Sequence, residues 1–117
     1  MLALVVDDNI EIAMLISLIL REIDVDSHQI YQGDKVLDWL EHHTPDLVFL
    51  DLQLPGMNGL DILRVMKEDT RWMSIPVIVM TANSQMANAA EVDADLVLLK
   101  PVSLHQIQSL AQRALIT

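Results

Sequence analysis

The chain has 117 residues, enough for one domain with its own core, and its lack of cysteine excludes a disulfide framework or a thiolate site. Seven lysines and arginines against 17 aspartates and glutamates give a net charge of −10 at pH 7, which argues against direct binding of nucleic acid or anionic membranes. No apolar run approaches the roughly 18–20 residues of a membrane span, and the start of the chain has no basic signal region, so we expect a soluble, cytoplasmic protein.

Four short apolar runs are typical of β-strands that are covered on both faces. Each has four or five Val, Ile, Leu, Phe or Met residues without polar alternation: Leu2–Val6, Asp46–Leu50, Pro76–Met80 and Asp95–Leu99. A fifth candidate, Ser27–Tyr31, is more polar. Its composition fits an exposed edge strand.

Helical patterns separate these strands. After Asn9, a suitable helix N-cap, four apolar residues follow the i, i+3, i+4, i+7 spacing of an amphipathic helix: Ile12, Leu15, Ile16 and Ile19. Three further helices are predicted over Asp34–His42, over Asn58–Glu68 and from Ser103 onward. The alanine-rich segment Ser84–Val92 is predicted to be a short helix with weak amphipathicity.

The regular alternation of strands and helices predicts the fold class. It indicates an α/β protein with a parallel sheet, right-handed crossovers and helices on both faces. The length fits a doubly wound, five-stranded sheet of the flavodoxin-like kind, with strand order 2-1-3-4-5. In that order the polar Ser27–Tyr31 strand lies at an edge.

Acidic residues come directly after two strands that should be neighbours. Ligands of such sheets bind beyond the carboxyl ends of the strands, near the point where strand order reverses. Asp7 and Asp8 follow the first strand and Asp51 follows the third, so we expect the three carboxylates to converge. Thr81 follows the fourth strand and Lys100 the fifth.

These five side chains suit phosphoryl chemistry. Three close carboxylates repel one another, and a hard divalent cation such as Mg²⁺ removes that conflict. A lysine and a hydroxyl beside them suit a phosphoryl group, whose charge spreads over three oxygens. Because no serine or cysteine pairs with a histidine in the sequence, Asp51 is the best candidate to carry the phosphoryl group.

Each residue also has a structural interpretation. Asp8 could cap the first helix, Asp51 could belong to an ordinary strand-to-loop turn, and Thr81 could be a structural hydroxyl. Lys100 before Pro101 could be a solvated lysine at a turn. Their joint placement at strand ends favours the functional interpretation.

Four motifs resemble the receiver domain of bacterial two-component response regulators, over essentially the whole chain, residues 1–117. They are LVVDDN (4–9), DLQLPGMNG (51–59), PVIVMTA (76–82) and LLKP (98–101), in family order and with family-like spacing. The resemblance implies a phosphorylation switch. A histidine kinase or a phosphotransfer protein would offer a phosphohistidine, and Asp51 would accept its phosphoryl group.

The resemblance also implies roles for the neighbouring residues. Asp8, Asp51 and the backbone carbonyl of Gln53 would bind Mg²⁺, and Asp7 would act largely through water. Thr81 and Lys100 would contact the acyl phosphate. A cis peptide bond between Lys100 and Pro101 would aim the lysine inward.

Three departures from the family pattern lie on its output side. Val97 stands three positions before the lysine, where the family usually has an aromatic residue, and Asp93-Ala94 replaces a Gly-Ala pair. The stretch between Thr81 and Lys100 is about one helical turn shorter than usual. In the family, the face formed by the fourth helix, fifth strand and fifth helix binds an output partner or a second copy. The chain itself carries no output domain, so we expect a stand-alone receiver or a piece of a larger protein.

Two other functions remain open at this stage. The domain could be an interaction module that keeps the site as a scaffold and signals without phosphate. It could also be a Mg²⁺-dependent phosphohydrolase with an aspartyl-phosphate intermediate, but that class needs a second acid two residues beyond Asp51, where Gln53 stands. A receiver is no enzyme in the usual sense, although it assists its own phosphorylation and dephosphorylation.

Overall fold

A single parallel sheet organises the molecule. The computed structural model describes residues 1–91 and 93–115. The strands are β1 (Leu2–Val6), β2 (Asp26–Ile30), β3 (Leu47–Asp51), β4 (Val77–Thr81) and β5 (Leu96–Leu99). They are hydrogen-bonded in the order β2-β1-β3-β4-β5, and every neighbouring pair is parallel. The predicted fold class and strand order are confirmed.

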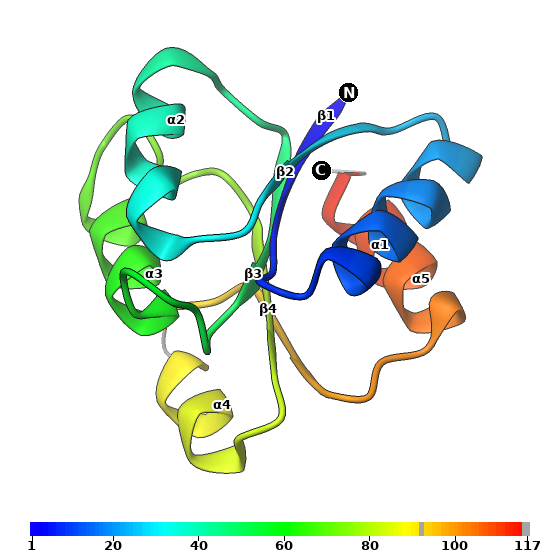
Figure 1. Cartoon of the computed structure of the whole chain (residues 1–117). Coiled ribbons are helices and arrows are strands. Elements are labelled where there is room, and N and C mark those ends of the chain that lie inside the picture. The colour runs from blue at the N-terminus through cyan, green and yellow to red at the C-terminus, as the bar shows by residue number, and fades with distance from the viewer. Residues whose placement is uncertain (92, 116–117) are drawn as a thin grey trace.

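Helices cover both faces of this sheet. They are α1 (Ile10–Glu22), α2 (Val36–His42), α3 (Gly59–Glu68), α4 (Ser84–Ala90) and α5 (Leu104–Leu115). Figure 1 shows α1 and α5 on one side of the sheet and α2, α3 and α4 on the other. Each side has its own cluster of buried apolar side chains, which explains why β1, β3 and β4 carry runs of consecutive apolar residues without polar alternation.

Three strands begin one residue later than predicted, at Leu47, Val77 and Leu96, and β2 lies one residue earlier than predicted, at Asp26–Ile30. An aspartate precedes two of the later starts, and Pro76, which has no N–H, precedes the third. The Asp46 carboxylate accepts the Leu2 N–H at 2.8 Å, and the Asp95 carboxylate accepts the Val77 N–H at 2.7 Å. Two strands also end one residue later than predicted. Asp51 is therefore the last residue of β3 and Thr81 the last residue of β4, rather than the first residues of the following loops.

The predicted helix starts are largely confirmed. The Asn9 side chain accepts the N–H groups of Glu11 and Ile12 and so caps α1, which removes the need for Asp8 as a cap. Ser103 accepts the Gln106 N–H, and the Gln106 side chain accepts the Ser103 N–H, as in a capping box. At the second helix, a short 3₁₀ turn at Gly33–Lys35 precedes α2. The predicted end of the fourth helix at Val92 lies outside the described residues.

The face of α1 that packs against the sheet is not centred on the residues that the apolar spacing predicted. Leu15 is 45% exposed, whereas Ala13, Ile16, Ile19 and Leu20 are buried. The prediction for Leu15 was wrong because spacing alone does not distinguish a side chain at the centre of a helix face from one at its margin. Three further apolar side chains of α1 are exposed: Ile10, Met14 and Leu18. Within the described residues, no helix has both the length and the apolar character needed to cross a membrane.

A backbone constraint at the end of α1 gives a stability test. Asp24 has φ = 62°, a left-handed conformation that costs an L-residue with a Cβ roughly 1–2 kcal/mol. Aspartate tolerates this conformation better than alanine because of its short polar side chain. We expect Asp24→Ala to lower the free energy of unfolding in urea by about 1 kcal/mol. Asp24→Gly should cause no loss, and an equal loss in both variants would contradict this explanation.

Candidate functional site

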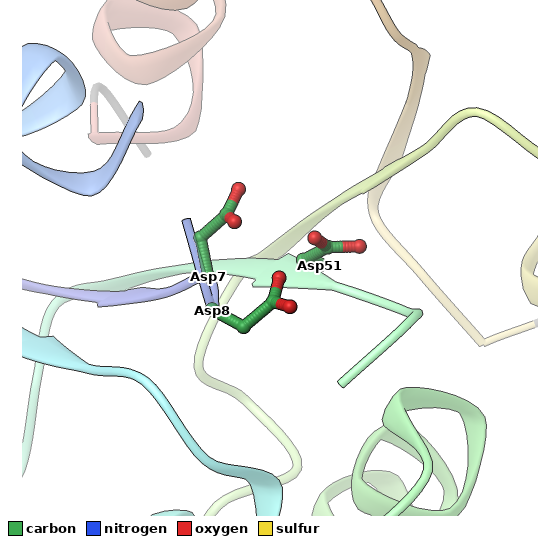
Figure 2. Close-up of side chains that lie close together, drawn as sticks. All are labelled: Asp7, Asp8 and Asp51. Atoms are coloured by element: carbon green, nitrogen blue, oxygen red, sulfur yellow. The ribbon is translucent and has the colours of Figure 1, made fainter. Parts of the chain in front are cut away.

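Three carboxylates meet at the carboxyl edge of the sheet. β1 and β3 are adjacent, with Val6 paired to Leu50, so the residues after β1 lie beside the end of β3. Asp7, Asp8 and Asp51 each offer an oxygen, and these oxygens all lie within 4.8 Å of one another (Figure 2). The predicted convergence is therefore observed.

Lys100 joins the two buried members of this group. Its Nζ donates to Oδ2 of Asp7 and to Oδ2 of Asp51, each at 2.9 Å. The backbone holds the lysine in place, since its N–H donates to the Thr81 carbonyl at 2.8 Å and the Lys100–Pro101 peptide bond is cis. The cis bond implied by the resemblance is present.

Backbone groups hold the remaining oxygens of the two buried carboxylates. Oδ1 of Asp7 accepts the Asn9 N–H at 2.9 Å, and Oδ1 of Asp51 accepts the Gln53 N–H at 3.0 Å. Asp7 is fully buried and Asp51 is only 4% exposed, whereas Asp8 is exposed. These contacts fix the orientation of Asp7 and Asp51 before any ligand arrives.

The electrostatics of the site leave it negative. Burial raises the pKa of Asp51 above its ordinary value of 3.8, although the Gln53 N–H and Lys100 act in the opposite direction; Asp7 adds to the increase. Burial opposes the charge of Lys100, but its hydrogen bonds to Asp51 and Asp7 outweigh that effect and raise its pKa. One ammonium among three carboxylates leaves negative charge that attracts a cation.

Thr81 lies at the end of β4, one residue beyond the pair formed by Asp51 and Met80. It is fully buried, and its hydroxyl oxygen accepts the Asn83 N–H at 3.1 Å. The Asn83 side chain in turn caps α4 by accepting the N–H groups of Gln85 and Met86. The structural role considered for Thr81 is therefore real, and the residue also ends the strand that neighbours β3 and Asp51.

The donor set fits the divalent cation that the resemblance implies. Carboxylate oxygens are the ligands that Mg²⁺ prefers, and two of the three acids lie on adjacent residues at a loop. The site contains no thiolate, and the nearby positive charge belongs to a lysine that has two carboxylate partners. A hard oxygen-binding ion suits this arrangement better than a soft transition metal.

Comparison with known proteins identifies the family. The model of the response regulator receiver domain matches residues 3–112, so the chain belongs to that family. Such domains are the signalling domains of two-component systems rather than classical enzymes.

Two curated relatives are similar over most of the chain. The DNA-binding response regulator MtrA of Mycolicibacterium paratuberculosis is 37% identical over 101 residues, which are 84% of this chain and 44% of that protein. The regulatory protein LuxO of Vibrio vulnificus is 35% identical over 86 residues, or 74% of this chain and 18% of that protein. The chain thus spans less than half the length of these relatives.

Solved structures show the same fold. A receiver domain of a signal transduction histidine kinase from Syntrophus aciditrophicus has a TM-score of 0.90 at 26% identity, covering 97% of this chain and 89% of that one. A response regulator described as putative, from Chloroflexus aurantiacus, has a TM-score of 0.92 at 22% identity, covering 99% and 98%.

The raised pKa of Asp51 gives a test of the site's electrostatics without any ligand. A carboxyl whose pKa is raised on folding destabilises the folded state once it ionises, so the penalty is present above the raised pKa and vanishes below the ordinary value of 3.8. We therefore expect Asp51→Asn to raise the free energy of unfolding at pH 7 in metal-free buffer. This advantage should shrink as the pH falls toward about 4. Urea unfolding of the wild type and Asp51→Asn between pH 7 and about 4 measures this difference in stability. A difference that does not change with pH would contradict a raised pKa of Asp51.

Proposed function

We propose that this domain is a phosphoacceptor of a two-component phosphorelay and that Asp51 carries the phosphoryl group. The supporting observation is the position of Asp51: buried at the end of β3, hydrogen-bonded to Lys100 and beside two further carboxylates. A histidine kinase or histidine phosphotransfer protein would be the donor. The chain would act in the cytoplasm, without itself binding nucleic acid.

Transfer of the phosphoryl group from the donor to Asp51 is a displacement at phosphorus. An oxygen of Asp51 forms a new O–P bond to the phosphohistidine of the donor, and the N–P bond to the imidazole breaks. The electron pair of that bond stays on the imidazole nitrogen, which takes a proton. Asp51 must be ionised to attack, and the hydrogen bonds from Lys100 and the Gln53 N–H favour that form.

The other residues of the site would stabilise the negative charge of the phosphoryl group. Asp8, Asp51 and the backbone carbonyl of Gln53 would hold Mg²⁺, with Asp7 acting largely through water. When bound, Mg²⁺ supplies positive charge to the phosphoryl oxygens. Lys100 would move its ammonium from Asp51 toward a phosphoryl oxygen, and the Thr81 hydroxyl would donate to another.

The output surface is proposed from the family resemblance. The face formed by α4, β5 and α5 would bind an output partner or a second copy once Asp51 is modified. Leu99 at the end of β5 and Leu104 at the start of α5 are exposed, which suits a contact surface. Val97 is partly buried and packs against the core cluster on the α2–α4 side of the sheet.

Two rival functions remain as outcomes of the tests. The exposed apolar side chains of α1 are also what an interaction module that signals without phosphate would present. A phosphohydrolase is disfavoured because the neutral Gln53 stands where a second acid is needed, and its N–H is bonded to Asp51.

Incubation with acetyl phosphate and Mg²⁺ tests the proposal. We expect each chain to gain one phosphoryl group, measured by intact mass, in an adduct that is stable in acid and labile in base. Asp51→Asn should abolish the adduct because it removes the nucleophile. Asp38→Asn is a matched control, since Asp38 is an exposed acid of α2, and it should be modified like the wild type.

The outcome also separates the rival functions. A wild-type chain that stays unmodified would favour the interaction module, and sustained turnover of small phosphoesters would favour the hydrolase. An adduct that survives in Asp51→Asn would place the acceptor elsewhere and overturn the assignment.

Binding of Mg²⁺ gives a second test. A ligand at 100 times its dissociation constant stabilises the folded state by about 2.7 kcal/mol, so Mg²⁺ should raise the thermal midpoint of the wild type. Asp8→Asn should remove most of this increase without lowering the metal-free midpoint, because Asp8 is exposed and its charge is repelled by those of Asp7 and Asp51. An increase that persists in Asp8→Asn, or is equally large with Na⁺ at the same ionic strength, would contradict the proposed ligand set.

A further inference from the structure

All three glycines of the chain lie around one loop. They are Gly33, Gly56 and Gly59, and the loop is the segment 52–58, which joins β3 to α3 directly after Asp51. Gly56 is within the loop, Gly59 starts α3, and Gly33 comes from the 3₁₀ turn before α2. Gly33 is thus distant in sequence from a loop that it touches in space.

The contact at Gly33 is made between backbones. Its N–H donates to the Pro55 carbonyl at 2.8 Å. A Cβ added at Gly33 would lie 2.1 Å from the Met57 carbonyl oxygen, a separation that real Cβ atoms essentially never show. Because Met57 presents a backbone atom, no side-chain rotation relieves the overlap. The loop and the 3₁₀ turn would have to move apart by about 1 Å.

The loop is also held at its other contacts. Gly56 has φ = +88°, and a Cβ there would lie 2.5 Å from Oδ1 of Asp34, the neighbour of Gly33. At the start of α3, the Gly59 N–H donates to the Leu52 carbonyl at 3.1 Å, and a Cβ added at Gly59 would lie 2.5 Å from the Cα of Leu52. The loop therefore lies between the 3₁₀ turn and α3, with backbone contacts to both.

This clamped loop carries part of the site. The Gln53 N–H bonds to Asp51, so the position of the loop is coupled to the carboxylate. In the proposed site the Gln53 carbonyl is also a metal ligand. We propose that Gly33 is a positioning residue for the divalent cation, because its lack of a side chain lets the 3₁₀ turn hold the 52–58 loop against the site. This inference rests on the proposed Mg²⁺ site.

The two alkaline-earth cations differ in their response to a displaced ligand. Mg²⁺ demands near-ideal octahedral geometry with oxygens at about 2.0–2.1 Å, whereas Ca²⁺ accepts variable geometry and 6–8 ligands at longer distances. The displaced 52–58 loop would carry the Gln53 carbonyl with it, and a shift of more than about 0.2 Å already exceeds the usual variation in metal–ligand distance. The acidic side chains of Asp7, Asp8 and Asp51 would remain and would still attract Ca²⁺.

The test compares both cations in the Gly33→Ala variant by isothermal titration calorimetry. We expect Mg²⁺ affinity to fall about tenfold or more, the usual range for the loss of an outer-shell support. Ca²⁺ affinity should fall about threefold or less, because Ca²⁺ tolerates the displaced carbonyl. In metal-free protein, the NMR signal of the Gln53 amide should shift. Ile19→Ala is the control: it truncates a buried side chain of α1 in the core cluster on the other face of the sheet, and should leave the ratio of the two affinities unchanged.

Each result decides between the proposals. A wild type that binds no Mg²⁺ overturns the proposed metal site itself. A wild type that binds Mg²⁺, together with an equal loss for both cations or no loss in Gly33→Ala, overturns the positioning role alone. If Gly33→Ala does not fold, Pro55→Gly loosens the same loop without adding an atom. It should lower Mg²⁺ affinity more than Ca²⁺ affinity, and an unchanged ratio overturns the inference.

Discussion

The ammonium of Lys100, shared between Asp7 and Asp51, is the interaction on which the site depends. It joins the residue after β1, the end of β3 and the loop after β5, so one side chain links three separate parts of the sheet edge. Two carboxylates as buried as these would be costly without such a partner. In the proposed transfer, the flexible stem of Lys100 would let its ammonium move from an Asp51 oxygen to a phosphoryl oxygen.

Much of this arrangement could be predicted from the sequence, because it follows from the periodicity of single segments. Unbroken apolar runs such as Leu2–Val6 indicated strands covered on both faces, and the polar β2 indicated an edge. Once the strand order was inferred, the convergence of Asp7, Asp8 and Asp51 followed from the rule that ligands bind at the reversal of strand order. The fold and the acidic cluster could therefore be predicted without knowledge of the side-chain contacts between segments.

What the sequence could not predict depends on contacts between distant segments. β3 and β5 begin one residue later than predicted, directly after Asp46 and Asp95, whose carboxylates bond to neighbouring strands; a local pattern does not show such contacts. The exposure of Leu15 depends on how α1 is rotated against the sheet. The close approach of Gly33 to Met57 has no signal in either segment alone, although the chain has only three glycines and Gly33 is the one outside the segment that follows Asp51.

Aspartates have different roles at the amino-terminal and carboxyl-terminal edges of the sheet. At the amino-terminal rim, the carboxylates of Asp46 and Asp95 each accept a main-chain N–H of the neighbouring strand. At the carboxyl rim, the acids face one another around an ammonium. The aspartates of this chain therefore have different structural roles at the two edges of the sheet, although each contributes the same negative charge. Neutralising an aspartate to reduce the negative charge of the chain would therefore remove a hydrogen bond at the start of a strand on one edge of the sheet. On the other edge, the same kind of substitution would remove a carboxylate of the proposed metal and phosphoryl site.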